Sequence, residues 1–222
     1  YPAPRAWSLP EMKQIVSRWD DALGTEGWTS SYLGNHDLPR MVSRFGDDGR
    51  YRRPSAKLLA TLVCTLRGTP TLYQGDELGM TNAPFRSIDD YRDVQSLNYY
   101  RDAVQGRGMP PEQALDVLAR VSRDHSRTPM QWSDAKHAGF TTGTPWIMVH
   151  PNHREINAAA QWDDEHSVLR YYQRLIQLHK AHPALTYGTY EPFAPDDRNV
   201  WIYQRRGADE TLLVVLNVTT SP

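Results

Sequence analysis

Residues 29–40 read TSSYLGNHDLPR, and they indicate the fold class more directly than any other part of the chain. The residues before Gly34 predict a short strand that buries Tyr32 and Leu33. Pro39 has no backbone N–H to donate, so strand pairing cannot continue past it. We therefore expect a strand over residues 29–34 that ends in a sharp turn.

Three polar residues, Asn35, His36 and Asp37, follow this strand directly. In parallel α/β barrels the carboxyl ends of the strands carry the chemistry, so a His-Asp pair at such an end is a candidate site. The alternative is an ordinary strand-to-turn junction in which Asp37 caps the residues that follow. The surrounding segments have to decide between the two interpretations.

Helices and strands alternate around this stretch. Ser8 followed by Glu11 is a capping box, and it predicts an amphipathic helix that ends at Gly24. A second, apolar helix is predicted over residues 55–66, and a short strand over residues 71–73. Because helix, strand, helix and strand follow in turn, the pattern predicts an α/β fold with parallel strands.

The second half of the chain predicts a long loop followed by a β module. Residues 75–163 are too many for an ordinary βα connection, so they must form an elaborated loop, with helices near 93–104 and 111–121. A helix from Ser167 should end near His182 and Pro183. Antiparallel strands are expected after it, over residues 186–190, 200–205 and 211–218.

Composition excludes several classes of protein. The 222 residues are 39% hydrophobic, which is enough for a packed core, and 25 Lys and Arg against 26 Asp and Glu favour no nucleic-acid partner. The single cysteine, Cys64, cannot form a disulfide within the chain and is expected to be buried. No segment approaches the roughly 20 apolar residues of a membrane span, and residues 1–5 are not a signal peptide. We therefore expect no membrane partner and a cytoplasmic location.

Taken together, three motifs resemble the α-amylase superfamily, glycoside hydrolase family 13. They are YLGNHDLPR at residues 32–40, GTPTLYQGDELGMTN at 68–82 and SRDHSRTPMQW at 122–132. Within that family they are most similar to the oligo-1,6-glucosidase, dextran glucosidase and α-glucosidase branch. The resemblance implies a (β/α)8 TIM barrel followed by an antiparallel β C-terminal domain. Residues 1–183 would hold about strands seven and eight of the barrel with their helices, and residues 184–222 the beginning of the last domain.

The resemblance also implies roles for the residues after the first strand. Family members cleave with retention, using an aspartate nucleophile and a glutamate acid/base, and both are expected upstream of Tyr1. Retaining chemistry needs two carboxyl groups about 5 Å apart, so this chain alone would be incomplete. Asp37 matches the third carboxylate, which stabilises the transition state by holding ring hydroxyls, and His36 donates to the same ring. Asn35 is expected to support the turn.

Arg123 and Arg127 are candidate substrate-binding residues in the third motif. By resemblance, Arg123 reaches the innermost subsite, where its planar fork can hold a sugar hydroxyl and an upstream carboxylate together. Arg127 is expected to be mainly structural. Without the resemblance, two arginines four residues apart are typical of a solvated helix face.

Gln95 bears on the choice of substrate. Family members that prefer α-1,6 links generally carry glutamate here, and that residue is thought to contact the second sugar. A neutral amide keeps the hydrogen bond but loses the charge, so α-1,4-acting glucosidases, broader ones and transglucosylases stay open. Sucrose isomerase and trehalose-6-phosphate hydrolase, which share the fold, stay open as well.

Two other acidic segments are weaker candidates for a site. Adjacent carboxylates on a strand point to opposite faces, so Asp76 and Glu77 are expected to hydrogen-bond loops rather than to form a catalytic pair. Residues 44–50 lack the oxygen spacing of a calcium loop. We expect no metal or cofactor in this chain, and any calcium site of the family would lie upstream.

The leading hypothesis is a retaining, exo-acting α-glucosidase whose partners are a small α-glucoside and the upstream polypeptide that completes the barrel. Two hypotheses come from other classes. A non-catalytic barrel subunit would be expected to lose the pocket residues, whereas His36, Asp37 and Arg123 are present. A stand-alone carbohydrate-binding module would be expected to fold without upstream sequence.

Overall fold

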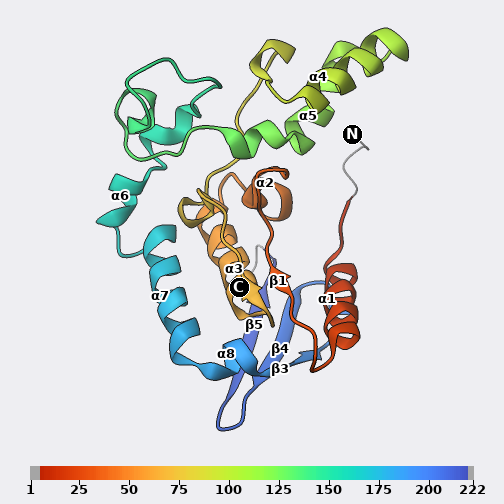
Figure 1. Ribbon diagram of the computed structural model, residues 1–222, viewed down its shortest axis with the longest axis vertical. Coiled ribbons are helices and arrows are strands. Elements are labelled where there is room, and N and C mark those ends of the chain that lie inside the picture. Colours follow the sequence, from red (N-terminus) through yellow and green to blue (C-terminus); the bar gives the residue numbers. More distant parts are fainter. Residues whose placement is uncertain (1–5, 220–222) are drawn as a thin grey trace.

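The computed structural model describes residues 6–219. Residues 1–5, on which the expectation about a signal peptide rests, lie outside the described residues. A small parallel sheet of two strands lies among helices, with a long helical loop on one side and an antiparallel sheet of three strands on the other (Figure 1).

The N-terminal helix α1 and the first strand follow the predicted order. Helix α1 spans Leu9–Leu23, begins where the Ser8 hydroxyl accepts from the Glu11 N–H at 3.4 Å, and ends at Gly24. Strand β1 (Ser30–Ser31) pairs in parallel with β2 (Thr69–Pro70). The parallel α/β arrangement expected from the alternation is therefore confirmed.

Both strands differ from their predicted extents. Strand β1 is shorter than residues 29–34, and Tyr32, which lies beyond its end, is 49% exposed rather than buried. Strand β2 lies two residues before the predicted 71–73. It begins after Gly68, whose φ of 120° and close approach to Thr29 suit only glycine.

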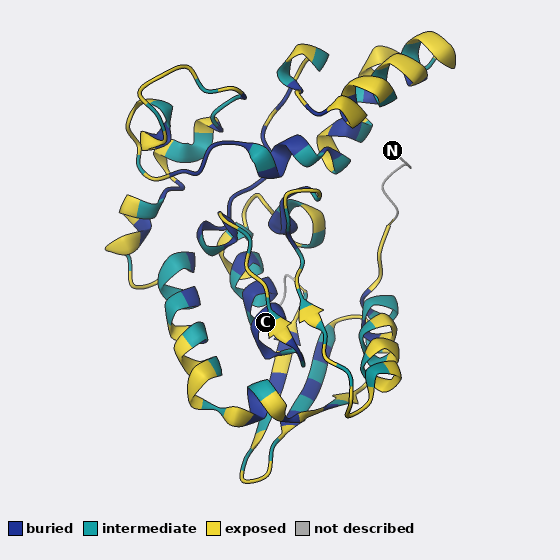
Figure 2. Ribbon diagram, viewed as in Figure 1, coloured by how far each residue is buried: buried dark blue, intermediate teal, exposed yellow. Residues whose placement is uncertain are grey.

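Helix α3 lies at the centre of the main hydrophobic core. It spans Arg52–Thr65, follows the short unpredicted helix α2 (Met41–Phe45), and packs against α7 (Val168–Ala181) (Figure 2). Cys64 is 1% exposed on α3, as predicted, and burial raises the pKa of its thiol to about 11. Among residues 6–219, no helix combines the length and apolar character that a membrane span requires.

The long loop between β2 and α7 carries the two predicted helices, which are confirmed. Helix α4 spans Val94–Arg101 and continues as a π-helical turn, η3, over Asp102–Gly106, while α5 spans Pro111–Val121. The loop also contains α6 (Ala158–Trp162). Its remaining turns are 3₁₀-helical: η1 (Asp76–Leu78), η2 (Ile88–Asp90), η4 (Arg123–Arg127), η5 (Lys136–Gly139) and η6 (Pro151–Arg154).

The chain then enters the antiparallel sheet. The strand predicted over 186–190 is present but begins only at Thr189, as β3, because Pro183 opens a further helix, α8 (Pro183–Tyr187). Strands β3 (Thr189–Phe193), β4 (Val200–Arg206) and β5 (Thr211–Asn217) pair in chain order. The inner face of this sheet packs against Leu9 of α1 and Leu62 of α3, so it shares a hydrophobic core with the helices.

Candidate active site

The turn after β1 is held by the side chain of Asn35. Its Oδ1 accepts from the backbone N–H of Asp37 at 2.7 Å, which fixes the direction in which Asp37 leaves the strand. Gly34 lies directly over Asp76: a Cβ at this position would come within 2.9 Å of the carboxylate oxygen. Glycine therefore lets the turn approach η1 closely, and Asn35 supports the turn as expected.

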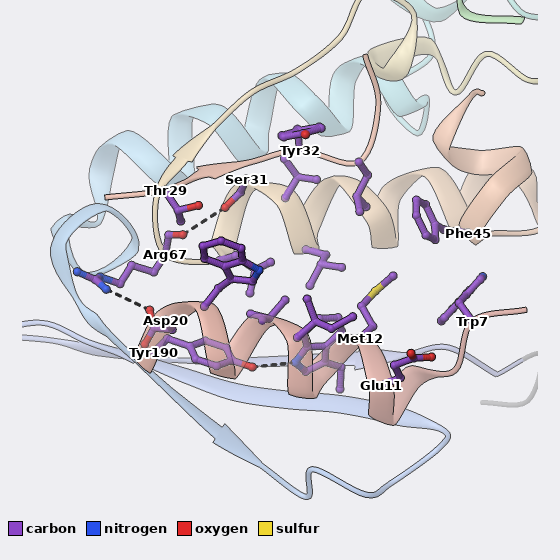
Figure 3. A pocket seen from close by; sticks show the side chains of 18 of the residues that line it. Trp7, Glu11, Met12, Asp20, Thr29, Ser31, Tyr32, Phe45, Arg67 and Tyr190 are labelled. Atoms are coloured by element: carbon purple, nitrogen blue, oxygen red, sulfur yellow. Dashed lines mark hydrogen bonds and ion pairs between the residues drawn. The ribbon is translucent and has the colours of Figure 1, made fainter. Parts of the chain in front are cut away.

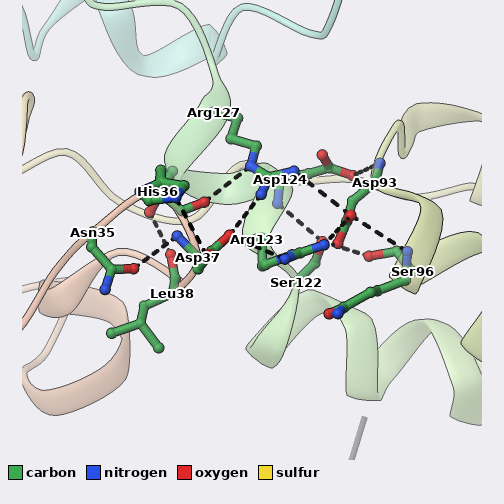
Figure 4. Close-up of polar contacts among 12 residues, drawn as sticks. Asn35, His36, Asp37, Leu38, Asp93, Ser96, Ser122, Arg123, Asp124 and Arg127 are labelled. Carbon is green, nitrogen blue, oxygen red and sulfur yellow. Dashed lines mark hydrogen bonds and ion pairs between the residues drawn. The ribbon is translucent and has the colours of Figure 1, made fainter.

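Two arginines converge on the carboxylate of Asp37 (Figure 4). Its Oδ1 accepts from Nη1 of Arg123 at 3.1 Å and from Nη2 of Arg127 at 2.8 Å. Its Oδ2 lies 3.3 Å from Nε2 of His36, and the Asp37 side chain is 46% exposed. One carboxylate oxygen is therefore held by the two cations, and the other faces His36 and solvent.

Asp93 holds the other side of Arg123. Its two carboxylate oxygens accept from Nε and Nη2 of Arg123 at 2.9 and 2.6 Å, and the Asp93 side chain is only 2% exposed. Nη1 of Arg127 lies 3.6 Å from the same carboxylate. The cluster thus contains two carboxylates and two guanidinium groups in alternation.

The turn η4, which carries both arginines, is tied to the ends of the two parallel strands. The Ser126 hydroxyl donates to the carbonyl of Leu38 at 2.6 Å, and the Tyr73 hydroxyl donates to the carbonyl of Ser126 at 3.0 Å. The buried guanidinium of Arg40 donates to the carbonyls of His125 and Gln74 at 3.2 and 2.6 Å. These bonds place η4 next to the turn that carries Asp37.

His125 anchors η4 from the inside as a neutral imidazole. Its Nδ1 accepts from the N–H of Ala83 at 3.1 Å, which leaves Nε2 to donate to the carbonyl of Leu118 at 3.2 Å. The ring stacks on Phe85. Burial lowers the pKa of His125 to about 4, because a second proton would have to enter a buried site and would break the bond from Ala83.

Asp76 and Glu77 support the loop after β2. They lie in the 3₁₀ turn η1 and not on a strand, so the alternation argument was wrong, although their expected hydrogen bonds to loop backbone are confirmed. Asp76 accepts from the N–H of Tyr73 at 3.3 Å, and Glu77 accepts from the N–H of Gly75 at 2.7 Å. Burial raises the pKa of Asp76 to about 7, and the nearby Arg40 opposes that rise.

The structure brings together four of the five residues singled out from the sequence: His36, Asp37, Arg123 and Arg127. Arg127 contacts the Asp37 carboxylate directly, and the mainly structural role expected for it stays a prediction. The fifth, Gln95, is exposed on the first turn of α4, where its backbone N–H lies 3.4 Å from Oδ1 of Asp93.

Sequence reasoning missed Asp93. Its one visible signal was its position at the start of the predicted helix near 93–104, where aspartate is typical of an N-cap. The contact with Arg123 joins residues 30 positions apart, and nothing in the spacing of the two residues indicates that pairing.

A cleft of about 710 Å³ lies elsewhere, between α1, β1 and α3 (Figure 3). It is lined mainly by apolar side chains, including Ile15 and Trp19, and by none of the residues of the Asp37 cluster. Asp20 and Arg67 form an ion pair of 3.2 Å at one end. This lining suits the packing of further polypeptide better than it suits chemistry.

Within the described part of the chain, no three His, Cys, Asp or Glu side chains are grouped so that they could hold a metal ion.

The sequence matches the family described as "Alpha amylase, catalytic domain" over residues 4–188. The chain belongs to the α-amylase family. It is 49% identical over 213 residues to an oligo-1,6-glucosidase of Parageobacillus thermoglucosidasius. The aligned residues cover 96% of this chain and 38% of that protein. The chain is 48% identical to a trehalose-6-phosphate hydrolase of Bacillus subtilis, over 98% of this chain and 40% of that protein.

Solved structures of other α-amylase family enzymes match the fold. An isomaltulose synthase of Erwinia rhapontici NX5 superposes with a TM-score of 0.94 at 46% identity, over 97% of this chain and 39% of that chain. A trehalulose synthase superposes with a TM-score of 0.94 at 44% identity, over 96% and 39%. This α-amylase family chain therefore has the fold of part of the barrel and spans about two fifths of the length of these relatives.

Proposed function

We propose that this chain is the C-terminal part of a retaining, exo-acting α-glucosidase that releases glucose from short α-glucosides. In this proposal β1 and β2 are strands seven and eight of the (β/α)8 barrel, and residues 184–222 begin the antiparallel C-terminal domain. The observation that carries the proposal is the Asp37 carboxylate, which stands after a parallel strand with one oxygen held by Arg123 and Arg127 and the other left toward His36 and solvent.

The geometry suits stabilisation of a transition state with positive charge on a sugar ring. The two guanidinium groups hold Oδ1 of Asp37, so the carboxylate does not have to reorient when a glucosyl ring arrives. Oδ2 can accept from a ring hydroxyl, and His36 can donate to a neighbouring one. A hydrogen bond to a carboxylate strengthens as charge develops on the ring, so these contacts favour the transition state over the ground state.

We propose that the nucleophile and the acid/base come from upstream polypeptide. The support is that this chain spans only 38% and 39% of the lengths of two relatives. In addition, the second edge of β1 pairs with no strand among residues 6–219, and the apolar cleft beside it can take a further strand. Parallel sheets are normally covered on both faces and rarely consist of two strands.

Two further candidate functions are trehalose-6-phosphate hydrolysis and isomerisation of sucrose, which are carried out by enzymes of similar fold. They are favoured by the 48% identity to a trehalose-6-phosphate hydrolase and by the superposition on isomaltulose synthases, some of which were solved with D-glucose or with sucrose. Gln95, at the start of α4, is the proposed contact to the second sugar. We propose no cofactor for this chain, and its cytoplasmic location stays a prediction.

The test is a substrate panel for the complete polypeptide: isomaltose, maltose, sucrose and trehalose 6-phosphate, with products identified by chromatography. The proposal predicts glucose from isomaltose or maltose, with the anomeric configuration retained in the first product. Isomaltulose or trehalulose from sucrose would favour the sucrose isomerase. Glucose 6-phosphate from trehalose 6-phosphate would favour the trehalose-6-phosphate hydrolase. Inactivity on all four would contradict the proposal and favour a non-catalytic barrel.

A further inference from the structure

We propose that Asp93 is a positioning residue: it sets the guanidinium of Arg123 so that Nη1 reaches Asp37, and it couples the start of α4 to that contact. The inference rests on the proposed function, in which Asp37 acts on the sugar ring.

Two carboxylates, those of Asp93 and Asp37, contact different parts of the Arg123 guanidinium. Asp93 takes the Nε and Nη2 donors at 2.9 and 2.6 Å, which is the bidentate arrangement that fixes the plane of a guanidinium. The remaining terminal nitrogen, Nη1, then points at Oδ1 of Asp37 at 3.1 Å. Asp93 therefore determines which part of Arg123 faces the site.

The two carboxylates differ in burial. The Asp93 side chain is 2% exposed and that of Asp37 is 46% exposed, so Asp93 has little access to water and Asp37 has much. If Asp93 lost its charge, Asp37 would be the nearest carboxylate able to take both ends of the Arg123 fork. Such a pair would occupy Oδ2, the oxygen that the proposed function assigns to the substrate.

Asp93 is itself held by the residues on either side of Arg123 in the sequence. Oδ2 of Asp124 accepts from the backbone N–H groups of Arg92 and Asp93 at 2.8 and 2.9 Å. The hydroxyls of Ser96 and Ser122 form a bond of 2.9 Å, and both residues are fully buried. These bonds tie the start of helix α4 to turn η4, and Gln95 lies two residues after the residue that orients Arg123.

Asp93 also has a structural role, as the N-cap of α4. Oδ1 of Asp93 also lies 3.4 Å from the N–H of Gln95, as in a helix N-cap. Asparagine and serine cap helices about as well as aspartate does, so Asp93→Asn and Asp93→Ser preserve the cap while removing the charged fork. If Asp93 only caps α4, both variants should behave like the wild type.

The experiment measures kcat and KM of the complete polypeptide on 4-nitrophenyl α-glucoside for both variants. Positioning predicts a loss of kcat on the order of 10²-fold with KM changed much less, because the misplaced group acts in the transition state. The matched control is Asp164→Asn, which removes a partly exposed ion pair of 3.0 Å with Arg53, away from the Asp37 cluster, and should leave kcat unchanged.

A double-variant cycle asks whether Asp93 acts through Arg123. The loss in the Asp93→Asn, Arg123→Lys double variant should be close to that of Arg123→Lys alone, whereas independent roles would give losses that multiply. Unchanged kcat in both Asp93 variants, or losses that multiply, would overturn the inference.

A crystal structure of Asp93→Asn gives a readout that does not depend on activity. It should show Arg123 within hydrogen-bond distance of both oxygens of Asp37, and an Arg123 that has not moved would overturn the inference. Wild-type inactivity on every α-glucoside would instead defeat the proposed function alone, since the crystal structure would still test the positioning.

Discussion

Arg127 donates from Nη2 to Oδ1 of Asp37 across 2.8 Å, and from Nε to the carbonyl of the preceding residue, His36, across 3.0 Å. The guanidinium thus holds the carboxylate and the backbone that carries it at the same time. A planar group with several fixed donors can make both contacts, and a lysine ammonium has no comparable geometry.

Arg127→Lys should therefore lower kcat/KM of the complete polypeptide on 4-nitrophenyl α-glucoside about tenfold or more, since a hydrogen bond to a charged group contributes roughly 1.5–3 kcal/mol. Steady-state kinetics measure it. The control is Arg18→Lys, at an exposed position of α1, which should leave the kinetics unchanged. Equal kcat/KM for Arg127→Lys and the wild type would show that the contact has no role in the reaction.

His125 predicts a pH dependence of stability. Its pKa is lowered to about 4 in the folded protein, so the unfolded chain takes up the proton first as the solution becomes acidic. The stabilisation from the neutral ring is therefore complete above about pH 6.5 and is lost progressively as the pH falls from there to about 4. A shift of this size corresponds to roughly 3 kcal/mol.

His125→Asn tests this dependence, because asparagine can still accept from the N–H of Ala83 but does not titrate. Denaturant unfolding of the complete polypeptide at pH 7.5, 6 and 5 should show the wild type losing stability relative to the variant as the pH falls. His166→Asn, at an exposed position, should follow the wild type. A constant difference between wild type and His125→Asn across this range would contradict the assignment.

Lys13 joins α1 to the loop between β3 and β4. Its side chain is 1% exposed, and its ammonium donates to the carbonyls of Ala194 and Asp197 at 2.9 and 2.8 Å. Lys13→Met should lower the free energy of unfolding by about 1–3 kcal/mol, measured by urea denaturation. Lys180→Met, at an exposed position near the end of α7, serves as the control. Equal effects of the two substitutions would show that these two hydrogen bonds contribute nothing.

The 222-residue chain expressed alone should be inactive on 4-nitrophenyl α-glucoside and poorly folded. The physical reason is the open edge of β1 and the apolar cleft beside it, which expose Ile15 and Trp19 to water. Circular dichroism and an activity assay measure both properties. Clean activity from the isolated chain would show that the nucleophile and the acid/base lie within it.

Periodic and capped elements were predictable from the sequence. The boundaries of α1, α5 and α7 agree closely with the prediction, since Ser8, Pro111 and Ser167 mark helix starts by local chemistry. The strands β1 and β2 were less predictable, because their length depends on neighbouring strands and not on their own residues. The helix α8 was missed because Pro183 was interpreted as an end when it also opens a helix.

The candidate site was predictable only in part. His36, Asp37 and Arg123 stand in motifs that resemble those of a known family, whereas the contact of Arg127 with Asp37 joins residues 90 positions apart. Asp93 shows why: its buried bidentate pair with Arg123 arises from the folding of the long loop, and no local pattern encodes it.

The most direct test of the account is the turnover of Asp37→Asn in the complete polypeptide, measured on 4-nitrophenyl α-glucoside beside its thermal unfolding. Asparagine keeps the shape but removes the charge that Arg123 and Arg127 hold. The account predicts a loss of kcat of about 10²–10³-fold or more with the fold retained, as for other groups that stabilise a transition state electrostatically. Turnover close to that of the wild type would contradict it.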